Sequence, residues 1–288
     1  MVRPWFVIPV LGLASGGVAL ATHHRIESAI AIALLGAALA AAIRAFNGPS
    51  IAAAVSAGAG GALGVLGLLV LDAVTVRTAI GGAAAMFAIC ELARAKPPNA
   101  SPLPAVGAAL VAGVLDPAYV ALVAVAGVHL VIAPWRQQRR WMVVVPIAGA
   151  LATILAVTIA LSSHLGALWV AWSGHAHHGV PLRAAVVRVG ELLGPLSACA
   201  AIFGLAVIAT RGRFAVASVA GVVALTALVT VTNGVVDPPV ALVASLGAGV
   251  AIGRLAAMIR LPVGQTFLGA TAGFVLVVVP AWSLVASL

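Results

Sequence analysis

Residues 51–71, IAAAVSAGAGGALGVLGLLVL, form an unbroken apolar run without a charged residue. A run of about 20 such residues is what an α-helix needs to cross the ~30 Å hydrocarbon layer of a bilayer. Similar runs recur along the whole chain, of which 64% is hydrophobic and only 7% is charged. Soluble domains carry roughly 25% charged residues. The sequence therefore predicts a protein built of many membrane-spanning helices.

The apolar runs predict an all-α polytopic bundle of about 11 spans, with a range of about 9 to 11, in one integral membrane domain over residues 1–288. Residues 102–133 are few for two crossings, so a re-entrant pair or one tilted helix are alternatives there. The Asp116-Pro117 step favours a split, because proline breaks the helical hydrogen-bond ladder. The expected spans are 4–22, 27–43, 51–71, 78–93, 102–115, 117–133, 142–161, 189–209, 214–232, 238–257 and 263–286.

The basic residues predict the orientation of this bundle. Lys and Arg accumulate on cytoplasmic loops of membrane proteins. A cytoplasmic N-terminus leaves only Arg25, Arg77, Arg183 and Arg188 of the 15 basic residues outside. The other basic residues then face the cytoplasm: Arg3, Arg44, Arg94, Lys96, Arg136, Arg139, Arg140, Arg211, Arg213, Arg254 and Arg260. They are scattered between apolar runs, which does not fit a nucleic-acid surface. The alanine-rich, lysine-poor composition is typical of a GC-rich genome, and we expect a bacterial plasma (inner) membrane.

The one long connection that is not strongly apolar is residues 162–183, SSHLGALWVAWSGHAHHGVPLR. We expect it to be a histidine-rich extracytoplasmic loop. Imidazole and carboxylate groups suit zinc, copper or nickel, so His175, His177 and His178 are candidate ligands of a divalent metal. The loop has neither cysteine nor acid and matches no familiar metal-site spacing, so a solvated loop is the alternative reading.

Most of the six acidic residues fall at predicted outer helix ends. Asp72, Asp116 and Asp237 are the candidates for chemistry at this face, while capping of helix N-termini is the alternative role for each aspartate. Glu91 lies at the cytoplasmic end, where Arg94 is its expected partner three residues on. No acid or lysine lies near the middle of a predicted span, and this disfavours ion-coupled pumps, which usually need such groups. His129 is the one histidine deep in an apolar run.

Residues 72–133 resemble the transmembrane spans of the GT-C superfamily of polyprenyl-phosphate-sugar glycosyltransferases. The resemblance lies in residues 76–81 (VRTAIG), residues 92–96 (LARAK) and the turn at residues 116–119 (DPAY). It implies sugar transfer from a lipid phosphate on the extracytoplasmic face. Asp72 and Asp116 would then be the catalytic acids, and Arg77, Arg183, His175 and Asp237 would bind substrate. The family has a catalytic acid in a sizeable first outer loop, whereas residues 23–27 are short and hold only Glu27.

Three functions follow from these patterns. The first is GT-C-like glycosyl transfer, or a catalytically reduced relative of such an enzyme, with membrane lipids and a lipid-phosphate-linked substrate as partners. The second is a permease for a small solute or a lipid, in which glycine-rich helices slide past one another. The third is a non-catalytic subunit that packs against other membrane proteins in a complex.

The topology makes a direct prediction. Single cysteines that replace Asp72, Asp116, His175 or Asp237 should all react with a membrane-impermeant maleimide added to intact cells, because all four positions face outward. A cysteine at Arg139 should stay unlabelled until the cells are opened. Labelling of the first four positions from opposite sides would contradict the span assignment.

Overall fold

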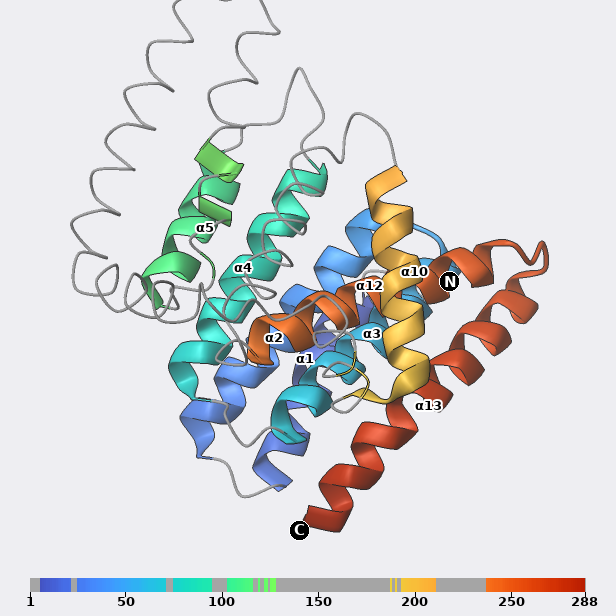
Figure 1. Ribbon diagram of the computed structural model, residues 1–288, viewed down its shortest axis with the longest axis horizontal. Coiled ribbons are helices and arrows are strands. Elements are labelled where there is room, and N and C mark those ends of the chain that lie inside the picture. The colour runs from blue at the N-terminus through green and yellow to red at the C-terminus, as the bar shows by residue number, and fades with distance from the viewer. Residues whose placement is uncertain are drawn as a thin grey trace, which may run out of the picture.

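The protein is helical throughout the part of the chain that its structure describes. This computed structural model describes residues 6–21, 25–70, 75–94, 103–115, 119, 122–123, 125–127, 187, 190, 193–210 and 237–287, and these residues include no strand. The helices pack as a bundle (Figure 1). They are α1 (Val7–Ala21), α2 (Ile26–Asn47), α3 (Ile51–Val70), α4 (Val76–Arg94), α5 (Leu103–Leu115), α10 (Pro195–Thr210), α12 (Asp237–Ala257) and α13 (Pro262–Ser287).

Three of the described helices are long and apolar enough to cross a membrane by length and composition, namely Ile26–Asn47, Ile51–Leu69 and Val76–Arg94. These apolar helices indicate a membrane protein, as the sequence predicts. The number of spans and the cytoplasmic N-terminus stay predictions. The loop 162–183 and the expected spans 142–161 and 214–232 lie outside the described residues.

Local signals set the boundaries of the central helices. Gly48 has a φ of 83°, and its N–H donates to the Arg44 carbonyl oxygen at 2.9 Å, which closes the end of α2. Glycine favours this position because other residues rarely adopt a positive φ. The hydroxyl of Ser50 then accepts the Ala53 N–H at 3.1 Å and caps α3. The resulting short turn sends α3 back along α2.

The expected span 189–209 is not one continuous helix. Val187, Gly190 and Leu193 are helical, but Gly194 has a φ of 85° and α10 begins only at Pro195. The cause is local, because proline disfavours helical geometry in the residue before it and glycine accepts the left-handed alternative. The predicted division before Pro117 is consistent with the end of α5 at Leu115.

Contacts between small residues fix the directions of the helices. Along α3 and α12, Gly60 lies against Gly249, Gly64 against Ser245 and Gly67 near Ala241, so these two helices are antiparallel. Asn47, at the end of α2, contacts Gly253 near the end of α12, which makes α2 and α12 parallel. Val55 and Ala59 of α3 meet Gly269 and Gly273 in turn, so α13 runs parallel to α3.

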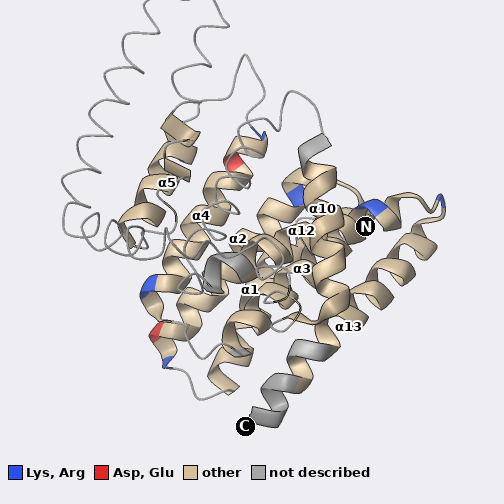
Figure 2. Ribbon diagram, viewed as in Figure 1, with Lys and Arg blue, Asp and Glu red and all other residues tan. Residues whose placement is uncertain are grey.

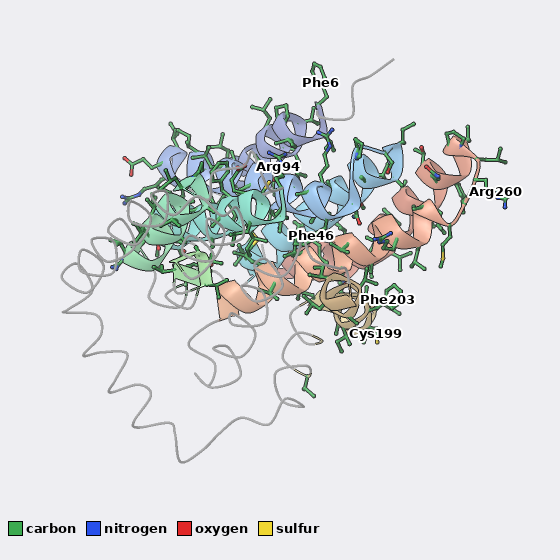
Figure 3. The ribbon with its side chains drawn as sticks, turned by 90° about the horizontal axis from the view of Figure 1, so that it is seen from above. Phe6, Phe46, Arg94, Cys199, Phe203 and Arg260 are labelled. Atoms are coloured by element: carbon green, nitrogen blue, oxygen red, sulfur yellow. The ribbon has the colours of Figure 1, made fainter. Side chains whose placement is uncertain are left out.

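The centre of the bundle is packed tightly around α2. Leu35, Leu39 and Ile43 are completely buried there, and Met86 and Ile89 of α4 pack in the same cluster. The outer surface is also apolar: Leu13, Phe267 and Trp282 are 77%, 73% and 75% exposed. Figure 3 shows Phe203 projecting from α10. Monomeric soluble proteins rarely expose large contiguous apolar surfaces, so these faces fit a lipid environment.

The two cysteines differ in burial. Their positions in apolar segments predict buried thiols, and Cys90 is buried in α4. Cys199 is exposed on α10 (Figure 3), so the prediction is wrong for this residue. An apolar segment in a membrane protein has a lipid-facing side, and hydropathy alone does not distinguish that side from the core.

Glycine contacts between α10 and α12 should be sensitive to one added methyl group. A Cβ at Gly204 would overlap the carbonyl oxygen of Gly247, so Gly204→Ala forces two backbones apart. We expect a loss of about 1–3 kcal/mol in stability, as for overpacked cores, measured by thermal unfolding in detergent. Gly17→Ala is the matched control, because a Cβ there meets nothing within 4 Å. Its stability should be unchanged or rise by up to ~1 kcal/mol from helix propensity; equal effects in both variants would refute the packing argument.

Candidate functional site

Charged residues gather at the ends of the helices, whereas the helix middles are uncharged over most of the bundle (Figure 2). One end, which we call the Arg77 end, holds the starts of α2, α4 and α12 and the ends of α3 and α5. The other, the Arg254 end, holds the ends of α2, α4 and α12. These assignments follow from the helix directions above and from a cluster that joins Ala79 of α4 to Ile32 of α2 and Leu69 of α3. The contact between Arg77 and Leu115 places the end of α5.

Arg77 joins two helices at its end of the bundle. Its Nε donates a hydrogen bond to the carbonyl oxygen of Leu115, the last residue of α5. The final carbonyls of a helix have no partner within the helix and carry partial negative charge. An arginine at the start of α4 therefore suits this position, and its bond holds the start of α4 against the residue that precedes Asp116.

Threonines cap α4 at the same end. The Thr78 N–H donates to Thr75 Oγ1 at 3.1 Å, and the Thr75 N–H donates to Thr78 Oγ1 at 3.0 Å. This reciprocal arrangement satisfies two backbone donors, as a capping box does. The alternative role of Asp72 as the cap of α4 is therefore filled by Thr75.

Of the remaining predicted site residues, the structure describes only Asp237. Asp237 is the first residue of α12 and lies at the Arg77 end, as Arg77 does. The other candidates fall outside the described residues: Asp72, Asp116, Arg183, His175, His177, His178 and His129. Within the described ranges, no group of three His, Cys, Asp or Glu residues is arranged to hold a metal ion. The predicted histidine site for a divalent metal thus stays a prediction.

The Arg254 end carries mainly positive charge. Arg44 and Arg254 lie in the last turns of α2 and α12, and Arg260 follows α12. Glu91 and Arg94 form the predicted ion pair, with 3.6 Å between Oε1 and Nη1. This pair is confirmed, and Arg94 is the last residue of α4. Both side chains are partly exposed, so the pair contributes little to stability.

A polar cluster that the sequence patterns do not reveal lies where α2, α3 and α12 meet at this end. The side-chain amide of Asn47 donates to Ser56 Oγ at 3.0 Å and to the Gly249 carbonyl oxygen at 3.3 Å. The glycine at 253 leaves room for the amide, because a Cβ there would overlap Asn47. The run of small residues at 247–253 (GAGVAIG) indicates close packing of helices, but it does not identify the residue that occupies the space.

Two buried polar atoms near this cluster lack hydrogen-bond partners among the described residues. They are Oδ1 of Asn47 and Nε of Arg254. A buried donor or acceptor without a partner costs free energy, and more so when the group is charged. The guanidinium of Arg254 therefore has one N–H group, at Nε, that no acceptor among the described residues satisfies.

No protein family, curated protein or solved structure matches this chain. The resemblance to the GT-C superfamily has no support from these comparisons. Functional inference for this protein therefore depends on its own residues.

The bond between Arg77 and Leu115 predicts a local effect. Arg77→Ala should raise hydrogen–deuterium exchange in the last turn of α5, because that turn loses its tie to α4. Arg25→Ala is the control, since Arg25 is exposed at the same end and makes no side-chain capping bond. If both variants leave exchange in residues 112–115 unchanged, Arg77 does not hold the two helices together.

Proposed function

We propose that this chain is a multi-pass protein of a bacterial inner membrane that binds a lipid-phosphate-linked sugar at the Arg77 end and transfers the sugar to an acceptor. The observation that supports this proposal best is the bond from Arg77 to Leu115. It places a cation beside the segment that leads into Asp116, at the end of the bundle where α3 leads toward Asp72. In the sequence, Asp72 lies five residues before Arg77 and Asp116 directly follows Leu115. A cation and two carboxylates are a suitable set of groups for this chemistry.

The proposed reaction assigns different tasks to these groups. A hydroxyl of the acceptor attacks the anomeric carbon of the sugar, and the bond between that carbon and the phosphate oxygen breaks. Asp72 or Asp116 takes the proton of the hydroxyl as general base. The exposed guanidinium of Arg77 stabilises the charge of the departing lipid phosphate, to which arginine binds with strong, directional hydrogen bonds. Asp237, at the start of α12, is the candidate for binding sugar hydroxyls.

A permease is the second candidate. At Gly204 and Gly247, the backbones of helices α10 and α12 approach one another closely. Small residues permit such close contacts between membrane helices. This favours a pair of helices that slide past one another during transport.

Lipid-phosphate binding tests the proposal first. The purified protein in nanodiscs should retain undecaprenyl phosphate in native mass spectrometry. Arg77→Ala should weaken retention by about tenfold, since a charge-assisted hydrogen bond contributes roughly 1.5–3 kcal/mol. Arg260→Ala, which removes the same charge at the opposite end, should have no effect.

Transfer is measured separately. In membrane vesicles, the wild-type protein should move radiolabelled glucose from undecaprenyl phosphate glucose to a membrane acceptor. Asp72→Asn and Asp116→Asn should retain the lipid, while at least one of them loses transfer. If the wild-type protein retains the lipid but transfers no sugar, the chain is a catalytically reduced relative. If it does not retain the lipid and does not transfer sugar, the proposal is rejected.

A further inference from the structure

The Arg254 end has basic groups that the proposed function does not use. Arg44 and Arg254 are half-buried in the last turns of parallel helices. Among the described residues, neither arginine forms an ion pair, and the acid at this end, Glu91, already pairs with Arg94. The positive charge of this end is thus uncompensated within the described part of the chain.

Asn47 holds the two arginine-bearing turns together. Its amide donates to the carbonyl oxygen of Gly249, five residues before Arg254, while Arg44 lies three residues before Asn47 on α2. Asn47 also donates to Ser56, so α3 is tied into the same junction. The positions of both arginines therefore depend on one compact contact among three helices rather than on a loop.

Arg254 has hydrogen-bonding capacity that the described residues do not use. Its Nε is buried and has no hydrogen-bond partner there. Arg254 as a whole is half-buried, and an arginine at a membrane interface is stabilised by a nearby anion. Phosphate oxygens are suitable acceptors, because they match the fork of N–H groups on arginine.

Neighbouring apolar residues favour a lipid over a free anion. Met258 lies four residues after Arg254 and is 78% exposed, and Leu255 and Leu261 are exposed as well. A phospholipid would place its phosphate at Arg254 and its acyl chains along these residues. Basic sites at the cytoplasmic ends of membrane helices commonly bind anionic headgroups.

We infer that Arg254 and Arg44, in the last turns of two parallel helices, make this end of the bundle a binding surface for the phosphate headgroups of anionic phospholipids. The site requires that the protein is embedded in a membrane, but it does not depend on glycosyl transfer. It lies at the opposite end of the bundle from Arg77, so each site can fail its test while the other passes.

Native mass spectrometry with phosphatidylglycerol and phosphatidylcholine tests this site. The wild-type protein should retain phosphatidylglycerol about tenfold more strongly than phosphatidylcholine, because the latter's headgroup has no net charge. Arg254→Gln and Arg44→Gln should each remove most of this preference, whereas Arg254→Lys should keep part of it as a point charge. The matched control is Arg260→Gln, which removes an exposed charge beyond α12 and should retain the wild-type preference.

Each other outcome has a defined meaning. An equal loss in Arg260→Gln would show diffuse attraction and overturn the site, as would equal retention of both lipids by the wild-type protein. Displacement of phosphatidylglycerol by inorganic phosphate would assign the site to a free anion instead of a lipid. Should Arg254→Gln fail to fold, Arg44→Gln and Arg254→Lys decide the result, with thermal unfolding in each lipid as the second readout.

Discussion

The bundle depends on close approach of α12 to its neighbours. Gly249 meets Gly60 of α3, Gly247 meets Gly204 of α10, and Gly253 receives Asn47 of α2. Between membrane helices, association relies on packing and interhelical hydrogen bonds rather than on the hydrophobic effect. Because these glycines have no side chain, they set the distance between the helix backbones. The register of α12 against three helices follows from those contacts.

That register gives the two ends of the bundle different chemistry. At the Arg77 end, the start of α4 is capped by threonines and tied to the end of α5 through Arg77. At the Arg254 end, Asn47 ties α2 to α12 close to the turns that carry Arg44 and Arg254. Helix C-termini carry partial negative charge, so arginines in these last turns are electrostatically favourable even before any ligand binds.

Hydropathy predicted most helix positions because an apolar run long enough to span lipid has few other stable structures. The expected spans 27–43 and 51–71 correspond to α2 (Ile26–Asn47) and α3 (Ile51–Val70). Hydropathy predicted helix boundaries less well where a single backbone conformation ends a helix. Gly194 is the example, because its positive φ divides the expected span 189–209. Hydropathy also gave the wrong environment for Cys199, since an apolar sequence is compatible with both core and lipid.

The sequence by itself determined a helical membrane protein, the Glu91–Arg94 pair and the placement of charges at helix ends, since these depend on local composition and on spacing within one helix. Only the tertiary structure decided that Arg77 reaches Leu115 and that Asn47 reaches Ser56 and Gly249. Asn47 and Gly249 come from helices far apart in the chain. Their contact requires that α3 and α12 pack closely, which Gly60 and Gly249 allow because they lie opposite one another. No periodicity within one segment encodes that arrangement, because it arises from the packing of several helices at once.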